Sequence, residues 1–142
     1  MTWGLEPGLL VVPAAHPARL LKDALKVRMS AKYPALEYGL GLPADWANYD
    51  GPPLLVVFDD GGASEWPVSD RATLRVTAWS NSLTTARDIA SHALGVTLTH
   101  KVEGLSQILP GTRVIDARDP ENGALMASYT VRARARTTIV SE

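Results

Sequence analysis

The chain has 142 residues, which is enough for one compact domain and short for two. Hydrophobic residues make up 46% of it and charged residues 20%, which excludes a chain too polar to fold. The formal net charge of -1 excludes a strong overall attraction to nucleic acid or to an acidic membrane, and the lack of cysteine excludes disulfides, thiolate metal ligands and cysteine nucleophiles.

The N-terminal residues lack the pattern of a targeting signal. They have neither the basic start nor the apolar stretch of a signal peptide, and no apolar run approaches the roughly 20 residues that span a bilayer. We therefore expect a soluble protein that is made in the cytoplasm and has no membrane partner. Residues 1–15 predict an irregular N-terminal arm, with one strand-like piece at Leu9–Val12, and residues 16–142 are expected to form a single domain.

A first helix is expected to begin at Pro17, because proline suits the first helical position. Apolar residues then recur at helical spacing, at Leu20, Leu21, Ala24 and Leu25. The helix should end before Pro34, since a residue that precedes a proline disfavours the helical conformation.

Two strands are predicted in the middle of the chain. The apolar run Leu54–Phe58 is typical of a strand that is buried on both faces. Asp59–Gly62 predicts a turn, and Ala63–Asp70 predicts the tip of a hairpin. Thr73–Trp79 alternates between apolar and polar side chains, as a half-buried strand does. The segment Gly41–Pro53, which precedes these strands, is expected to be a long aromatic loop.

A second helix should follow, with Ser82 or Thr84 as its N-cap. Its apolar positions are mostly small: Ala86, Ile89, Ala90, Ala93 and Leu94. Small side chains allow this helix to lie close against a sheet or another subunit. We expect it to end near Gly95 or one turn beyond.

Two final strands are predicted, a short one at Arg113–Arg118 and a long one at Leu125–Thr137, which has the longest alternating pattern in the chain. The expected order is one helix, two or three strands, a second helix and two strands. This order predicts an α+β fold, a mostly antiparallel β-sheet with two α-helices packed on one face, in a single domain.

Arginines mark one face of the last predicted strand, at Arg132, Arg134 and Arg136. Their guanidinium groups, spaced about 6.5 to 7 Å apart, repel one another and need carboxylates, solvent or phosphate nearby. A solvated face paired with acids of a neighbouring strand, a subunit interface and a ring lumen facing DNA all remain open. Arg75 and Trp79 lie on the polar face of their own strand. An exposed Trp79 would suit a protein contact, and burial beneath a loop or the N-terminal arm is an equal alternative.

The sequence contains no recognisable catalytic constellation. It lacks the Gly-x-Ser-x-Gly, His-Glu-x-x-His and phosphate-loop motifs. His16, His92 and His100 are scattered, so capping or solvated roles are expected for them rather than metal binding. The adjacent Asp59 and Asp60 point to opposite sides of a strand end, which favours a turn over a cation site. We expect no enzyme activity and no catalytic, cofactor-binding or metal-binding residues.

Residues 70–80 (DRATLRVTAWS) predict a strand that ends in an aromatic residue, and residues 85–90 (TARDIA) continue into a helix. Upstream lies a strand that ends in glycines, Leu54–Gly62, and downstream a long strand that starts at a tyrosine, Tyr129–Arg136. Together these elements resemble the tail terminator, or tail-completion, proteins of long-tailed bacteriophages. The resemblance covers most of the chain, from Pro17 to Thr137.

The resemblance implies a structural subunit that forms a homo-oligomeric ring of six on the head-proximal end of the phage tail tube. Such a ring ends tube polymerisation and provides the surface for head-tail joining. The implied partners are the tail tube protein and the head-tail connector or stopper proteins, with passive contact to DNA passing through the lumen. The implied location is the virion tail, and no cofactor is expected.

Candidates for the subunit interface or the lumen are Arg132, Arg134, Arg136, Arg75 and Trp79. The alternatives to a terminator are a head-tail connector or stopper, another minor tail protein, a small ligand-binding domain or enzyme, and a DNA-binding module. The last of these would bind with an affinity that falls steeply as salt rises.

Overall fold

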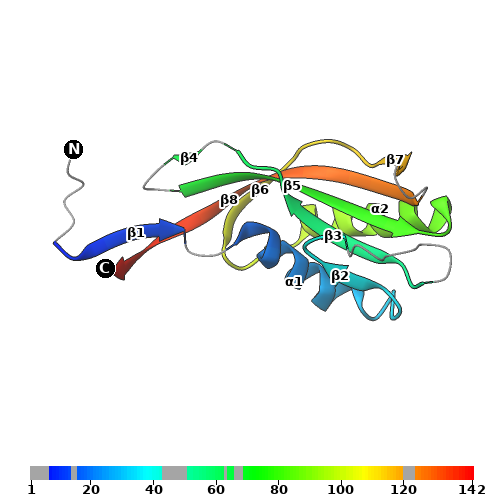
Figure 1. Ribbon diagram of the computed structural model, residues 1–142, viewed down its shortest axis with the longest axis horizontal. Helices are drawn as coiled ribbons and strands as arrows, with labels where there is room; N and C mark the ends of the chain where they lie inside the picture. The colour runs from blue at the N-terminus through cyan, green and yellow to red at the C-terminus, as the bar shows by residue number, and fades with distance from the viewer. Residues whose placement is uncertain (1–6, 14–15, 43–50, 63, 66–68, 120–123) are drawn as a thin grey trace.

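A computed structural model describes residues 7–13, 16–42, 51–62, 64–65, 69–119 and 124–142 (Figure 1). This part of the chain contains two helices and eight strands. In chain order they are β1 (Leu9–Pro13), α1 (Pro17–Met29), β2 (Glu37–Gly39), β3 (Leu54–Asp59), β4 (Ser64–Glu65), β5 (Ser69–Ser80), α2 (Leu83–Thr99), β6 (Leu105–Pro110), β7 (Ile115–Arg118) and β8 (Leu125–Ser141).

The sheet is built around β8, the longest strand, with 17 residues. The segment 125–136 of β8 pairs antiparallel with the whole of β5, β5 pairs antiparallel with β3, and β3 pairs parallel with β2. The short strands β7 and β6 pair antiparallel with β8, and β1 pairs antiparallel with its last residues, 137–141. The predicted mostly antiparallel sheet is therefore confirmed, with β2–β3 as its parallel pair among the described strands.

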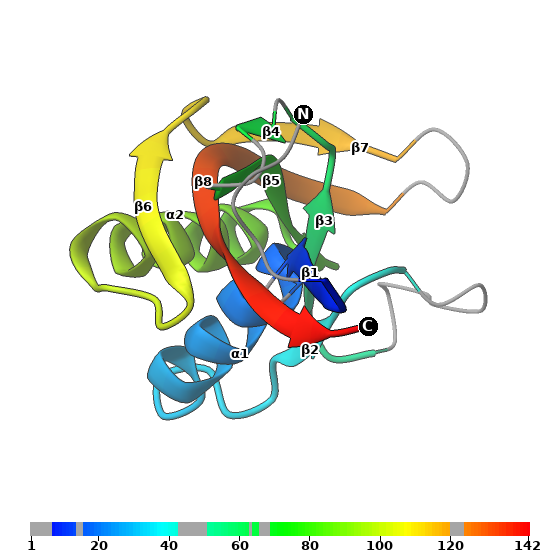
Figure 2. The same cartoon turned by 90° about the vertical axis from the view of Figure 1, so that its left-hand side faces the viewer.

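Both helices pack on the same face of this sheet, as predicted (Figures 1 and 2). Helix α1 buries one stripe at helical spacing, Ala18, Leu21, Leu25 and Met29. Helix α2 buries the smaller Ala86, Ile89, Ala90 and Ala93, so its backbone approaches the sheet closely. The facing sheet side chains come from alternate residues of β3, β5 and β8, which include Leu55, Leu74, Val76, Tyr129 and Val131. Burial of each large aliphatic side chain in this layer contributes about 1.5 to 3 kcal/mol.

Local signals set the helix boundaries. His16 is the N-cap of α1, where its Nδ1 accepts from the backbone N–H of Arg19, and Pro17 occupies the first helical position. Ser82 is the N-cap of α2, where its hydroxyl accepts from the N–H of Thr85. Of the two N-caps proposed for α2, Ser82 is the one observed. The helix runs to Thr99, one turn beyond Gly95.

The order of elements differs from the prediction in two places. Four strands, β2 to β5, lie between the helices rather than two or three, and three strands rather than two follow α2. The additional strand is β6, whose side chains are mostly exposed and whose register with β8 shifts between Leu105 and Gln107. An irregular edge strand of this kind has no alternating pattern to detect. The predicted strand at Arg113–Arg118 is shorter, since β7 begins at Ile115. Of the predicted aromatic loop Gly41–Pro53, residues 43–50 lie outside the described part of the chain.

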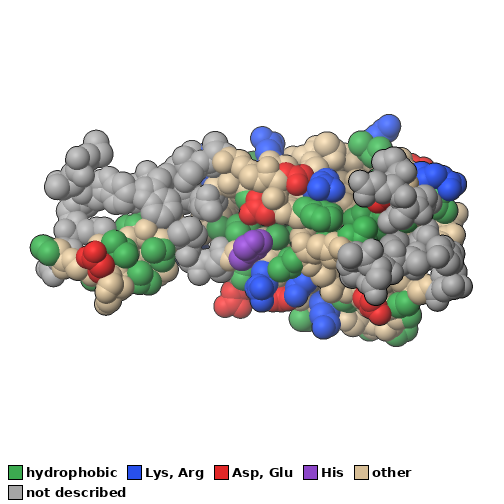
Figure 3. Space-filling model, viewed as in Figure 1, with side chains coloured by type: hydrophobic (Ala, Val, Ile, Leu, Met, Phe, Trp, Pro, Cys, Tyr) green, Lys and Arg blue, Asp and Glu red, His purple; other side chains and the backbone are tan. Residues whose placement is uncertain are grey.

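Strand β8 extends four residues past the predicted end at Thr137, because β1 pairs with this extension. We call β1 together with residues 137–142 the terminal ribbon. It extends beyond the body of the domain at one end of the long axis (Figure 1). Hydrophobic side chains lie at its surface (Figure 3). The strand-like piece expected at Leu9–Val12 is thus one half of a two-stranded ribbon.

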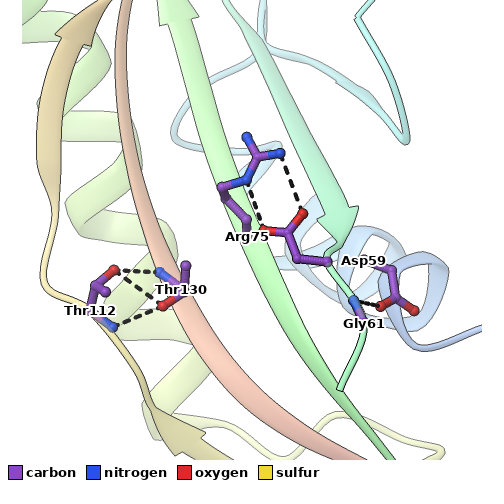
Figure 4. A network of polar contacts seen from close by, with 6 residues as sticks. Asp59, Gly61, Arg75, Thr112 and Thr130 are labelled. Atoms are coloured by element: carbon purple, nitrogen blue, oxygen red, sulfur yellow. Dashed lines mark hydrogen bonds and ion pairs between the residues drawn. The ribbon is translucent and has the colours of Figure 1, made fainter. Parts of the chain in front are cut away.

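The connection between β6 and β7 is held against β8 by reciprocal hydrogen bonds between Thr112 and Thr130 (Figure 4). The backbone N–H of Thr112 donates to Thr130 Oγ1 at 2.9 Å, and the N–H of Thr130 donates to Thr112 Oγ1 at 3.0 Å. The N–H of Gly111 also donates to the carbonyl oxygen of Thr130. A Cβ on Gly111 would lie 2.5 Å from Thr130 Oγ1, so this close approach requires glycine.

One polar pair lies inside the core. Tyr129 is fully buried and its hydroxyl lies 3.0 Å from Thr97 Oγ1. The Thr97 hydroxyl donates to the carbonyl oxygen of Ala93 at 2.7 Å, so Tyr129 is the donor to Thr97. Burial raises the pKa of Tyr129 well above its ordinary value of 10.0, and the hydrogen bond to Thr97 offsets part of this shift.

We predict that stability falls at high pH because Tyr129 cannot ionise inside the core. The pKa of this tyrosine is higher in the folded than in the unfolded chain. The stability that the neutral Tyr129 side chain contributes is therefore complete below about pH 10, and it is lost as the pH rises above that value. The loss should approach about 1.4 kcal/mol per pH unit. Tyr129→Phe should cost about 1 kcal/mol at neutral pH and flatten this dependence. Urea unfolding between neutral and alkaline pH measures both effects, and equal slopes for the two proteins would contradict the prediction.

A second prediction concerns the close contact between the β6–β7 connection and β8. Gly111→Ala should lower the free energy of unfolding by about 1 to 3 kcal/mol, because its methyl group collides with Thr130. Gly95→Ala is the matched control, since a Cβ there meets nothing within 4 Å and the site lies in α2. This control should raise stability by about 0.5 to 1 kcal/mol. Urea denaturation of both variants gives the comparison, and equal stability of the Gly111 variant and wild type would refute the steric argument.

Candidate interaction surface

The face of the sheet opposite the helices carries a cluster of arginines. Arg71 and Arg75 of β5 alternate with the core residues Ala72, Leu74 and Val76, so they point to this outer face. Arg132 and Arg134 of β8 do the same. The strand register places Arg71 directly opposite Arg134 and Thr73 opposite Arg132.

A hollow of about 270 Å³ lies between these side chains. We call it the arginine groove; its lining residues are Gly62, Arg71, Ala72, Thr73, Gln107, Leu109, Arg132, Ala133 and Arg134. Its floor is the sheet at Ala72 and Ala133, whose side chains belong to the core on the other side. Leu109 of β6 is 39% exposed and gives the groove an apolar wall. Three positive charges therefore surround a partly apolar surface.

Arg136 is separated from this group. It lines a different hollow, together with Lys101, Glu103, Gly104 and Leu105 at the connection between α2 and β6. The three arginines of the last strand, which the sequence places on one face, are thus divided. Arg132 and Arg134 line the arginine groove, and Arg136 lies beside a lysine and a glutamate.

Arg75 has a structural partner. Its Nε lies 3.0 Å from Asp60 Oδ2. Its guanidinium carbon lies 4.2 Å from the centre of the Phe58 ring. The neighbouring Asp59 accepts a hydrogen bond from the N–H of Gly61, whose φ of 86° suits glycine. The two carboxylates therefore diverge, one closing the turn and one pairing with Arg75, as the turn interpretation predicts. Ion pairs this exposed contribute at most about 1 kcal/mol.

Trp79 is 4% exposed, so of the two alternatives for this residue burial is the one observed. It packs in a small second cluster on the outer face with Leu54, Val56 and Ala124, and its ring meets the Phe58 ring edge to face at 6.1 Å. This cluster covers one end of the outer face. In a single subunit the indole surface is not available to a partner.

The terminal ribbon carries four of the eight exposed large hydrophobic side chains of the described chain. Leu9, Leu10, Ile139 and Val140 are between 37% and 56% exposed. The register pairs Leu10 with Val140 and Val11 with Ile139. Since neighbouring residues of a strand point to opposite faces, both faces of the ribbon carry apolar side chains.

Two of the histidines have capping roles, as expected, and the third packs against an aromatic ring. His16 caps α1, His100 lies at the C-terminal end of α2, and the ring of His92 packs edge to face on Tyr33 at 5.7 Å. Among the residues that the structure describes, no three His, Asp or Glu side chains are grouped so that they could hold a metal ion. No helix within the same residues is both long and apolar enough to cross a membrane.

Sequence reasoning missed Arg71, Gln107 and Leu109, which help to line the arginine groove. Arg71 could have been found, because it has the same parity on β5 as Arg75. Gln107 and Leu109 could not, because they lie on the undetected strand β6. The ribbon residues Ile139 and Val140 carry one local signal, a β-branched run that continues the last predicted strand.

Comparisons with known proteins support the fold. No protein family model matches the chain, and no curated protein matches it. Among solved structures, a chain from the virion of a native gene transfer agent particle has a similar fold, with a TM-score of 0.62 at 15% sequence identity. The match covers 87% of this chain and 98% of that chain. The two proteins therefore share a similar fold over most of this chain and nearly all of that chain.

Proposed function

We propose that the chain is a structural subunit of a phage-like particle and has no catalytic role. The observation that carries this proposal is the similarity to a chain of a gene transfer agent virion, which extends over almost the full length of that chain. A shared fold alone leaves function open, because one fold can serve many functions. The exposed apolar ribbon and the arginine groove add support, since both are surfaces suited to contacts with other proteins.

Within such a particle we propose the role of tail terminator. The family pattern is a strand that ends in an aromatic residue and runs through a short turn into a helix. In this chain Trp79 stands at the end of β5, Ser82 caps the next helix, and α2 begins at Leu83. This agreement in three dimensions supports the resemblance seen in the sequence.

The proposed subunit assembles into a ring of six that caps the tail tube at its head-proximal end. The ring stops addition of tube subunits and offers a surface to the head-tail connector or stopper proteins. The outer face of β5 and β8 is the proposed location of subunit contacts or of the lumen. Repeated around a ring, the arginine grooves of near-neutral subunits would form a basic band.

We predict that a stop codon in this gene changes tail length. Without a cap, tube subunits continue to add, so electron microscopy of the particles should reveal overlong or irregular tails beside DNA-filled heads that lack tails. The wild-type gene supplied in trans should restore uniform tails.

The alternative functions predict different electron micrographs of the same mutant. Tails of normal length that are unattached to heads would reject the terminator and assign the chain to a connector or stopper. Normal infectious particles would reject a structural role in assembly altogether.

A further prediction tests the outer face. Arg134→Glu should weaken each subunit contact about tenfold, the equivalent of about 1.4 kcal/mol, because it reverses a charge in the arginine groove. Arg28→Glu makes the same charge change on the exposed surface of α1, on the other side of the sheet, and serves as the control. Both variants should keep the wild-type circular dichroism spectrum. Sedimentation and counts of tailed particles measure the difference, and normal assembly of the Arg134 variant would show that the face is merely solvated.

A further inference from the structure

We propose that two copies of this chain pair through the outer edge of the terminal ribbon. Residues 138–142 of one copy lie antiparallel to the same residues of the second copy, and the two ribbons become one four-stranded sheet. The partner that this surface fits is thus another copy of the chain. The proposal goes beyond the function proposed above, since neither the terminator role nor the ring requires it.

The hydrogen bonds inside the ribbon show which backbone groups point outward. The N–H of Glu142 donates to the carbonyl oxygen of Gly8 at 2.8 Å. Opposite residues of an antiparallel pair alternate between hydrogen-bonded and non-bonded positions, so Val140, two residues earlier in the same register, also bonds to β1. The N–H and C=O groups of Ile139 and Ser141, on either side of Val140, therefore point away from β1.

This outer edge is open in the described part of the chain. Strand β5 pairs with β8 only as far as Arg136, and no described residue hydrogen-bonds to the backbone of Ile139 or Ser141. Both side chains are exposed, and the ribbon extends beyond the body of the domain (Figure 1). An uncovered strand edge of this kind is a template for pairing with another strand.

The other edges of the described sheet are protected against such pairing. Strand β6 has an irregular register between Leu105 and Gln107 and ends in Pro110, which lacks an N–H. Strand β7 carries the charged Asp116 and Arg118, and β2 and β4 have only three and two residues. Bulges, prolines, charges and short strands are the usual means of preventing edge-to-edge association. Residues 138–141 have none of these features, which favours them as the edge that pairs.

The outer edge of β1 is less suited to pairing than that of β8. Pro13 stands at an outward position of β1, where it offers no N–H, and Pro7 lies just before the strand. This leaves β1 with the outward N–H groups of Leu9 and Val11, between two prolines. The edge of β8 is better matched by an antiparallel copy of itself, which presents the same alternation of N–H and C=O groups.

Pairing centred on Val140 also brings apolar side chains together. Ile139 of each copy exchanges backbone hydrogen bonds with Ser141 of the other, and Val140 lies opposite Val140 of the second copy. Leu10 is the neighbour of Val140 on β1, so one row of apolar side chains crosses all four strands. These two residues are 42% and 38% exposed in the single chain. A larger sheet with an apolar face is more stable than an isolated two-stranded ribbon.

The contact is isologous, because the same residues meet from both copies. The antiparallel arrangement places Glu142 of the two copies at opposite ends of the pair, which avoids repulsion between like charges. A cyclic ring of six contains no two-fold axis that relates neighbouring subunits in this way. The contact therefore concerns the free protein in solution, and it is tested there.

Disulfide formation tests the pairing directly, because the natural chain contains no cysteine. In a non-bonded antiparallel pair the two Cα atoms are about 4.5 Å apart, which a disulfide spans. Val140→Cys in the purified full-length chain should therefore form a covalent dimer on mild oxidation. Leu10→Cys is the matched control, since the two Leu10 positions lie three strand spacings apart, about 14 Å.

The expected result, on gels run without reductant, is a dimer that is severalfold more abundant for Val140→Cys than for Leu10→Cys. Equal yields from the two variants would overturn the proposal. A larger yield from Leu10→Cys would also overturn it, because the ribbons would then pair through β1.

A pair of proline variants separates the edge contact from folding. Ile139→Pro and Val11→Pro each remove an N–H that points away from the partner strand, so both retain the hydrogen bonds inside the ribbon. Ile139→Pro should weaken dimerisation about tenfold or more in analytical ultracentrifugation, whereas Val11→Pro should change it less than about twofold. Equal effects of the two variants, or a wild-type chain that stays monomeric when concentrated, would refute the pairing. Overlong tails in the gene knockout together with a monomeric wild-type chain would leave the terminator role intact and remove only this contact.

Discussion

Backbone hydrogen bonding along β8 holds the structure together. This one strand pairs with β5 over 12 residues and also with β7, β6 and β1. Its register decides which side chains of five strands share a face. A shift by one residue would move Tyr129 and Val131 out to the surface and bring the arginines into the core. The burial of alternate side chains on β8 therefore fixes both the core and the outer face at once.

The two faces of the sheet differ in the side chains that they carry. The helix face is filled mainly with Leu, Val, Ile and Ala, and the fully buried hydroxyl of Tyr129 is hydrogen-bonded to Thr97. The outer face combines a small apolar cluster around Trp79 at one end with arginines at the other. Neither helix of the described chain covers the outer face, and Arg71 and Arg132 are exposed at its charged end. This end of the outer face is therefore accessible to other molecules.

The two ends of β8 have different environments. Near β5 the strand is packed by both helices, and its alternate residues are fully buried. Past residue 136 it leaves the body and has β1 as its partner. Apolar residues continue into this unsupported part, although a monomer would gain from polar ones there. Exposed apolar side chains of this kind are typical of a surface that contacts another molecule.

The sequence by itself determined the local features. Alternating polarity predicted the faces of β5 and β8, proline and serine signals predicted the starts of both helices, and the order of periodic segments predicted the α+β fold. These properties depend on side chains near one another in the chain, so they can be read without knowing the fold.

Only the tertiary structure decided the features that depend on distant segments. The pairing of β1 with the end of β8 created the terminal ribbon, and the irregular strand β6 supplied Gln107 and Leu109 to the arginine groove. The same packing separated Arg136 from Arg132 and Arg134 and buried Trp79 under Leu54 and Ala124. Strand register and packing between segments far apart in the chain set these positions, and a single-strand pattern contains no information about them.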